Sequence, residues 1–240
     1  MEDIALFIFY KNGSKYIVDV VNKADPKIYT YDAINIKRKL RELKNYIDSK
    51  CFAYFYPWQT ILDLDSNNKV IIAFNMKTNV IQAWCDFYYE KHNNIYTLKL
   101  NGINTRVVPK LKGLGTYIIN FIKDNYMSQV LYNDEIVDIH LLYLFALRIA
   151  NGFYKSKGLG LTEYKHGNGE STFYYLAKEL NESKLEKFKA YWKETHNTPM
   201  DQHDILDYNQ EIHNIKYHTD CINPKSRVSF FTKSRKSKGS

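Results

Sequence analysis

Cysteine is scarce in this sequence: 240 residues contain only Cys51, Cys85 and Cys221. The three are far apart and odd in number, and no two of them form a CxxC pair. This spacing argues against a disulfide framework and favours a reducing compartment.

Long apolar runs are also missing. The longest, near Leu141–Leu147, is far too short to cross a bilayer. The start, Met1-Glu2-Asp3, lacks the basic lead and the small-residue cleavage site of a secretory signal. We therefore expect a soluble intracellular protein, cytoplasmic or nuclear, with no membrane partner.

Residues that ligate metals do not form a familiar site. Four of them lie close together in the sequence, namely His203, His213, His218 and Cys221. Their spacing matches no known zinc pattern, and the cysteine has no near partner. We expect no metal.

The residues that are abundant allow an ordinary globular core. Hydrophobic residues make up 45% and charged residues 25%, and the length suits one domain with an appendage. The formal net charge of +8 is compatible with nucleic acid, an acidic membrane or an anionic cofactor as partner. Charge alone does not choose between them.

Apolar periodicity predicts strands and helices in alternation. Strands are expected at Ile4–Tyr10, Tyr16–Val21, Cys51–Tyr56, Ile61–Leu64, Lys69–Met76, Val80–Tyr89, Tyr96–Thr105, Ile136–Leu141, Leu161–Tyr164 and Ser171–Ala177. Helices are expected at Tyr31–Asp48, from Gly115 to about Tyr126, at Tyr143–Lys157 and at Glu182–Glu194. This order indicates an α/β fold with a mixed sheet.

The composition changes after residue 180 and again after residue 224. We expect a domain over residues 1–180, a helical or irregular extension over 181–224, and a basic tail over 225–240. Leu185, Phe188 and Trp192 form one stripe of the Glu182–Glu194 helix, which we expect to dock on the domain. The tail Lys225–Ser240 could contact nucleic acid, but its composition favours a disordered, solubilising end.

A basic, glycine-bearing turn follows the strand that ends at Thr105. It reads Lys110-Leu111-Lys112-Gly113-Leu114-Gly115, and an apolar helix begins directly after it. Glycine lets the backbone approach a phosphate closely, and the amides at a helix start point toward an anion. An ordinary strand-to-helix turn would have the same glycine spacing. The flanking strand, helix and lysines favour phosphate binding.

A second segment ends a predicted helix with an aromatic pair, four residues before a glycine. Its residues are Ala150, Phe153, Tyr154, Gly158 and Leu159. Together the two segments resemble the signature segments of the GCN5-related N-acetyltransferase (GNAT) superfamily. The resemblance covers about residues 60–178, with Lys110 in place of the usual Arg or Gln.

The resemblance implies a mixed, mostly antiparallel central sheet flanked by helices, and an enzyme that transfers acetyl from acetyl-CoA to a primary amine by direct attack. It implies that the loop amides bind the pyrophosphate of the co-substrate, from Lys110, Leu111, Lys112, Gly113, Leu114, Gly115 and Thr116. A strand that splays from its neighbour would hold the pantetheine and the thioester carbonyl through Ile103, Asn104 and Thr105. A gapped alternative anchored on Pro109 moves that role to Val107.

Tyr154 is implied as the general acid that protonates the departing thiolate. The base has no clean candidate, because Lys99, Asn101 and Leu142 stand where relatives carry Glu. Asp138 and His140 share the strand face of Leu142, and His140 titrates in the useful range.

Three further possibilities for the base stay open: Asp86, Glu90 and a water chain to bulk solvent. Leu147 also replaces an Asn that often contacts the cofactor in relatives.

The acceptor is left open by the sequence: a protein amine, an amino sugar or a small amine. Acidic residues are scarce near the two segments, which disfavours polyamines. The alternative function is a non-catalytic module on the same fold that binds CoA or nucleic acid. The sequence does not indicate an oligomeric state.

Overall fold

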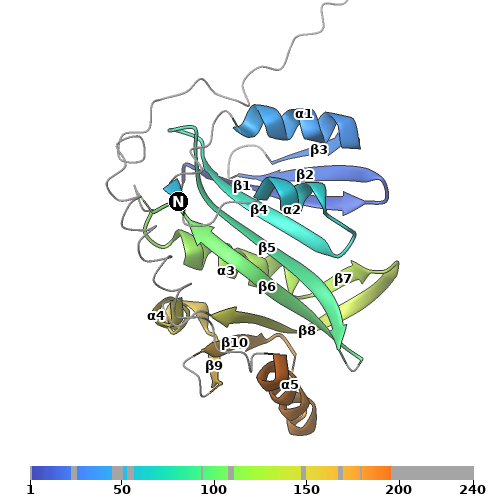
Figure 1. The fold of residues 1–240 in the computed structure, drawn as a ribbon, viewed down its shortest axis with the longest axis vertical. Helices are drawn as coiled ribbons and strands as arrows, with labels where there is room; N and C mark the ends of the chain where they lie inside the picture. Colours follow the sequence, from blue (N-terminus) through green and yellow to red (C-terminus); the bar gives the residue numbers. More distant parts are fainter. Residues whose placement is uncertain are drawn as a thin grey trace, which may run out of the picture.

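The computed structural model describes residues 2–22, 26–44, 51–52, 57–92, 94–107, 111–146, 150–166, 170–178 and 180–195. Within these ranges a ten-stranded sheet runs in the order β3-β2-β1-β4-β5-β6-β8-β10-β9, with β7 paired to β8 (Figure 1). The strands are β1 Ile4–Asn12, β2 Lys15–Val21, β3 Lys27–Tyr31, β4 Asn68–Asn75, β5 Val80–His92, β6 Ile95–Thr105, β7 Gln129–Tyr132, β8 Glu135–Ala146, β9 Thr162–Lys165 and β10 Ser171–Leu176. The helices are α1 Ala33–Lys44, α2 Pro57–Leu62, α3 Leu114–Tyr126, α4 Asn151–Tyr154 and α5 Glu182–Thr195.

The strand pairs are antiparallel except for β6 and β8, which run parallel with α3 between them in sequence. Parallel neighbours need a long crossover, and α3 supplies it. Tight turns connect β1 to β2, β4 to β5 and β5 to β6, with Gly13, Asn79 and Asn94 respectively in the left-handed backbone region that these residue types tolerate best. The expected fold class, a mixed and mostly antiparallel sheet flanked by helices, is confirmed.

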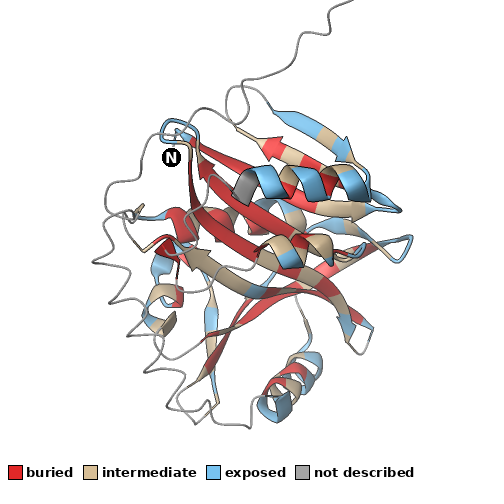
Figure 2. Ribbon diagram, turned by 45° about the horizontal axis from the view of Figure 1, so that its top comes forward, coloured by how far each residue is buried: buried red, intermediate tan, exposed pale blue. Residues whose placement is uncertain are grey.

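The central strands of the sheet are largely buried (Figure 2). Each face of the sheet buries its own apolar cluster. On one face α3 packs through Leu114, Ile118, Ile119 and Ile122. The other face is covered by α1 and α2 at the N-terminal strands and by α5 at β8 and β10. Phe188 and Trp192 of α5 are buried there, so the expected docking of that helix is confirmed.

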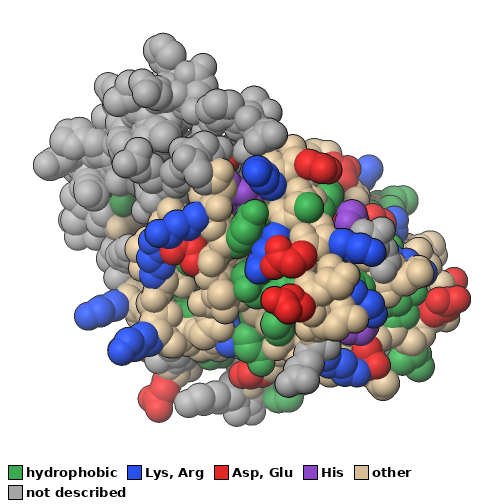
Figure 3. All heavy atoms as spheres, turned by 90° about the horizontal axis from the view of Figure 1, so that it is seen from below, with side chains coloured by type: hydrophobic (Ala, Val, Ile, Leu, Met, Phe, Trp, Pro, Cys, Tyr) green, Lys and Arg blue, Asp and Glu red, His purple; other side chains and the backbone are tan. Residues whose placement is uncertain are grey.

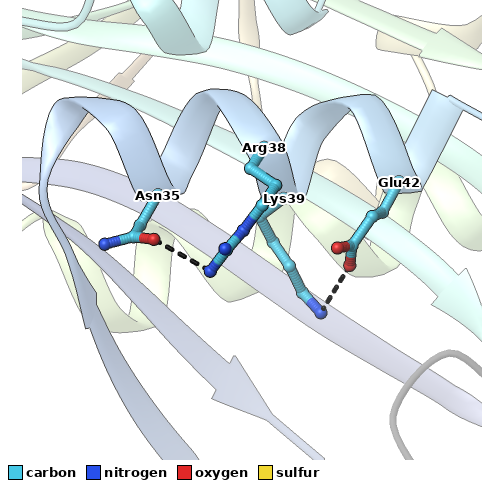
Figure 4. Close-up of polar contacts among 4 residues, drawn as sticks. All are labelled: Asn35, Arg38, Lys39 and Glu42. Carbon is cyan, nitrogen blue, oxygen red and sulfur yellow. Dashed lines mark hydrogen bonds and ion pairs between the residues drawn. The ribbon is translucent and has the colours of Figure 1, made fainter.

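Helix α1 begins with a side-chain cap, because Asp32 Oδ1 accepts a hydrogen bond from the Asn35 amide at 2.7 Å. This bond also lowers the pKa of the Asp32 carboxyl. Along the helix, Arg38 donates to Asn35 at 2.9 Å and Lys39 pairs with Glu42 at 3.5 Å (Figure 4). These contacts occupy the outer surface, while Ile36 and Leu40 face the sheet.

Some expected elements are wrong. The predicted helix Tyr143–Lys157 begins instead as strand, since β8 continues to Ala146 and α4 covers only Asn151–Tyr154. Tyr143 to Ala146 pair with β10, and this tertiary pairing overrides the helical appearance of an apolar run. Ile61 and Leu62 belong to helix α2, which starts at Pro57, a favoured first helical residue. The short strands β3 and β7 were not predicted.

The cysteine expectation also needs correction. Cys51 is disulfide-bonded, whereas Cys85 is a buried free thiol. The cysteine spacing argues against a disulfide framework, yet one cysteine is disulfide-bonded, so the cysteine count does not decide the compartment.

Several other predictions fall outside the described residues: the extension after residue 195, the basic tail Lys225–Ser240, and the cluster of His203, His213, His218 and Cys221. In the ranges that are described, no helix is long and apolar enough to span a membrane. Those same ranges hold no group of three or more His, Cys, Asp or Glu side chains placed to bind a metal.

Candidate functional site

Strands β6 and β8 separate partway along their length. Their parallel register ends at the pair Lys99 and Tyr143, although β6 continues to Thr105 and β8 to Ala146 (Figure 1). On its other side β6 stays paired with β5 as far as Thr105. Beyond Lys99, the edge of β6 that faces β8 therefore makes no ladder pairs with β8.

A β-bulge marks the start of this separation. Phe87 pairs with Leu100 and Asp86 pairs with Gly102, which leaves Asn101 as an extra residue in β6. A bulge bends its strand and increases its twist, and it re-aims the side chains that follow. After the bulge, Ile103 packs with the apolar cluster on the α3 face, and Asn104 pairs with Trp84, whose side chain lies on the opposite face.

The glycine turn begins α3. Gly113 has φ +81°, a left-handed conformation that costs an L side chain about 1–2 kcal/mol. No side chain caps the helix, and the Tyr117 amide makes a helical bond to the Gly113 carbonyl at 3.0 Å. The amides of the first turn, which include those of Gly115 and Thr116, have no acceptor one turn back in the helix and are suited to bind an anion.

Helix α4 and the segment after it are fixed against α3 by three close contacts. A Cβ added to Gly115 would lie 2.8 Å from Cζ of Phe153, so only glycine leaves room for that ring. Asn120 Nδ2 donates to the Gly158 carbonyl at 3.2 Å, and Lys123 Nζ donates to the Leu159 carbonyl at 2.8 Å. The two sequence segments, far apart in the chain, therefore pack directly on each other.

Tyr154 is held in this junction. Its side chain is 8% exposed, and its ring lies between those of Phe153 and Phe173, with centroids at 4.8 and 5.4 Å. Phe173 belongs to β10, which pairs with the end of β8. Packing of the aromatic rings thus restricts the direction of the phenol.

The resulting pocket has a volume of ≈ 730 Å³, within the usual range of small-molecule sites. Its lining combines backbone donors, one lysine and apolar side chains: Ile103, Thr105, Leu111, Lys112, Gly113, Leu114, Gly115, Thr116, Ala150, Phe153, Tyr154 and Ser156. Of the residues predicted from the sequence, Asn104 does not line it, and Lys110 lies outside the described residues. Ser156 was not predicted, because nothing in its neighbourhood distinguishes it from other serines.

The two predicted base residues, Asp138 and His140, lie elsewhere. Asp138 pairs with Lys178 at 2.6 Å, and this contact lowers the pKa of its carboxyl. It stands opposite Gln129 of β7, and His140 is six residues before the end of β8, or about 20 Å along a strand. Neither residue lines the pocket.

Another carboxylate lies closer to the bulge. Asp86 of β5 stands across from Gly102, and its Oδ2 accepts a hydrogen bond from Asn101 Nδ2 at 2.8 Å. Burial raises the pKa of this carboxyl, and the Asn101 bond partly opposes that shift. The sequence placed Asp86 on a strand, but its position beside Gly102 depends on the bulge.

No protein-family model and no curated protein matches the chain. Solved structures do match. AtaTR bound with acetyl-CoA is 16% identical, with 73% of this chain and 95% of that chain covered and a TM-score of 0.37. Nourseothricin acetyltransferase is 11% identical, with 72% and 86% covered and a TM-score of 0.29. A cAMP-binding acyltransferase from Mycobacterium smegmatis is 11% identical, with 89% and 81% covered and a TM-score of 0.35.

Proposed function

We propose that this protein transfers an acetyl group from acetyl-CoA to a primary amine. One observation carries the proposal: the uncapped start of α3 at Gly113–Gly115 and the phenol of Tyr154 line the same pocket. These are the two segments whose sequences resemble the GNAT superfamily. If the glycine turn were only a structural connection between a strand and a helix, there would be no reason to expect the second segment to pack against it.

The residues present suit the co-substrate. First-turn amides of α3, together with Lys112, would hold its pyrophosphate. The open edge of β6 at Ile103–Thr105 would hold the pantetheine arm, because free strand amides and carbonyls match its amide groups. When bound, acetyl-CoA supplies an activated acyl thioester.

Tyr154 is proposed as the general acid. As the amine nitrogen bonds to the acyl carbon and the C–S bond breaks, Tyr154 gives its hydroxyl proton to the sulfur. The proton that the nitrogen loses afterwards restores the phenol. The rings of Phe153 and Phe173 hold Tyr154 in one orientation, so proton transfer requires little rearrangement.

Replacing Tyr154 tests this role. The variant Tyr154→Phe keeps the ring packing and removes the proton, so kcat should fall about 10²- to 10⁴-fold while the affinity for CoA is retained. Calorimetry with CoA gives the affinity, and thiol release from acetyl-CoA with a panel of amines gives the turnover. Tyr132→Phe, on β7 and outside the pocket, is the matched control.

The outcomes separate the two candidate functions. Unchanged turnover in Tyr154→Phe would remove Tyr154 as the acid. Binding of CoA without acetylation of any amine would favour the non-catalytic module. If the wild-type protein does not bind CoA at all, the pocket has been misassigned.

A further inference from the structure

Two oppositely charged side chains lie at the start of the β6–β8 separation, on the face of the sheet opposite α3. Lys99 is the last β6 residue paired with β8. Its ammonium lies 5.5 Å from the ring centroid of Tyr88 on β5 and 5.2 Å from that of Phe145 on β8. Lys99 therefore reaches from one diverging strand to the other.

Asp86 is the second charge. Tyr88 and Asp86 alternate with the buried residues Phe87 and Cys85, so both face the side of the sheet away from α3. A Cβ added at Gly102 would meet Asp86 Oδ1 at 3.5 Å, which shows that the carboxylate lies against the bare backbone of β6. The next residue, Ile103, lines the pocket on the other face. One strand thus separates Asp86 from the pocket.

Within the described part of the chain, neither charge has a partner of opposite sign. Among the residues that the structure describes, no carboxylate lies within ion-pair distance of Lys99, and no Lys or Arg within that distance of Asp86. Another carboxylate on the same face of β5, that of Glu90, already accepts hydrogen bonds from Tyr143 and Thr97. A half-buried charge without a partner is costly, and a ligand that supplies the opposite charge offsets that cost.

We propose that the acceptor is a zwitterionic amine, with its ammonium received by Asp86 and its carboxylate or phosphate bound by Lys99. This proposal rests on the acetyl transfer proposed above and adds the class of acceptor and the base. Lys99 pairs with Tyr88, and Asp86 lies two residues before Tyr88 on β5, so the backbone positions of the two charges are about 7 Å apart along the strands. The side chains of Lys99 and Asp86 can move, so acceptors with different distances between ammonium and anion could fit. The test therefore includes amino acids of different chain length.

Asp86 also completes the movement of protons. Its carboxylate takes one proton from the ammonium, which frees the nitrogen lone pair to form the C–N bond. Tyr154 protonates the sulfur as the C–S bond breaks and regains a proton from the nitrogen. The proton on Asp86 then leaves to solvent, so the reaction releases the one proton that conversion of an ammonium to an amide requires.

Lys99 adds selectivity by repulsion. A polyamine would bring a second positive charge next to the Lys99 ammonium, which no described carboxylate neutralises, and like charges at close range disfavour binding. A neutral monoamine would leave Lys99 unpaired. An acceptor with one anionic group avoids both costs.

The test compares matched acceptors. Glycine, 4-aminobutanoate and 6-aminohexanoate are each paired with their amides, and the dipeptide Gly-Glu is paired with Gly-Gln. Spermidine is the cationic member. The acids should have kcat/KM about 10- to 100-fold above that of their amides, as expected for one charge-assisted contact. The free amino acids and the dipeptides distinguish a small-molecule acceptor from a peptide α-amine near an acidic side chain.

Variants at these two positions assign the residues. Lys99→Met should equalise acid and amide, and Lys99→Arg should keep the preference. Asp86→Asn should lower kcat by about 100-fold or more and shift the acidic limb of the pH–rate profile, with part of the rate restored in Asp86→Glu. The affinity for CoA, measured by calorimetry, should stay unchanged in all four variants.

The results separate this proposal from the function on which it rests. An amide or spermidine preferred over the acids, or an acid-to-amide ratio unaffected by Lys99→Met, would overturn the proposed acceptor class. Unchanged kcat in Asp86→Asn would remove the base. If wild-type protein binds CoA but acetylates none of the amines tested, both proposals are overturned and the protein is a cofactor-binding module.

Discussion

At the scale of single residues, Lys69 is a cation surrounded by aromatic rings. Its ammonium lies 4.7, 5.7 and 5.9 Å from the ring centroids of Tyr10, Tyr89 and Tyr126. Ring faces attract a cation, but burial opposes its charge and lowers the pKa of Lys69 to about 8. Burial also raises the pKa values of Tyr89 and Tyr126, so both rings stay neutral where Lys69 titrates.

Stability should therefore rise with pH between about 8 and 10.5, the folded pKa and the reference value for lysine. In this window the unfolded chain holds the proton that the folded protein has released, and added base favours the folded state. The upper limit is about 3 kcal/mol, at about 1.4 kcal/mol for each pKa unit. Urea unfolding of wild-type protein and Lys69→Met across this range measures the effect.

The control is Lys77→Met, which removes an exposed lysine and should keep the wild-type dependence. A parallel pH dependence in wild-type protein and Lys69→Met would show that Lys69 does not titrate in this window.

Gly115 is the residue on which the packing of the two segments depends. In Gly115→Ala the new Cβ must displace the ring of Phe153, from which it would otherwise lie 2.8 Å. Overpacking of this kind costs about 1–3 kcal/mol, and because Phe153 lines the pocket, the affinity for CoA should fall as well. Thermal unfolding and calorimetry measure the two effects.

Gly152→Ala is the matched control, because a Cβ there meets no atom within 4 Å. The double variant Gly115→Ala with Phe153→Ala should recover part of the lost affinity, since it removes the clash. Full CoA affinity in Gly115→Ala alone would contradict the role given to this contact.

At the scale of elements, the sequence was most informative where periodicity was local. The period of Ile118, Ile119 and Ile122 predicted α3, and the stripe of Leu185, Phe188 and Trp192 predicted α5. The apolar run that ends β8 fits either a strand or a buried helix, and only its pairing with β10 decides between them.

For the candidate site too, features within one continuous segment could be predicted, and features that depend on strand pairing could not. The glycine turn and Tyr154 belong to continuous segments, so their residues could be named before the fold was known. Asp86 and Gly102 are neighbours only because β6 carries a bulge, and a register shift between strands leaves no mark in either strand alone. The separation of β6 from β8 could be expected only through the resemblance.

Helix α5 makes its own prediction. Trp192 is fully buried among Tyr143, Tyr174 and Phe188, at ring distances of 5.4 to 5.9 Å. Trp192→Ala should therefore lower the free energy of unfolding by about 3–5 kcal/mol. Chemical denaturation measures the loss, and Lys187→Ala on the exposed side of the helix should change it by less than about 0.5 kcal/mol. A small loss in Trp192→Ala would mean that α5 contributes little to the fold.

At the scale of the whole molecule, the charge is unevenly placed along the chain. Six of the eight net positive charges come from Lys225–Ser240, where no acidic residue occurs. At the end of the molecule that carries β9, β10 and α5, basic and acidic side chains are interspersed on the surface drawn in colour (Figure 3). A basic isoelectric point is therefore a property of one segment, and it gives no reason to assign a nucleic-acid partner to the sheet.

The separation of β6 from β8 also has a consequence for steady-state kinetics. In the proposed arrangement the co-substrate binds on the α3 side of β6 and the amine on the Asp86 side, so neither has to leave before the other enters. Double-reciprocal plots against one reactant, at several fixed levels of the other, should intersect. Parallel lines would indicate a ping-pong cycle through an acylated enzyme. A dead-end analogue of the amine should likewise raise the apparent KM for the amine. It should not compete with acetyl-CoA, because the bend in β6 lets the two reactants enter from opposite faces of the sheet.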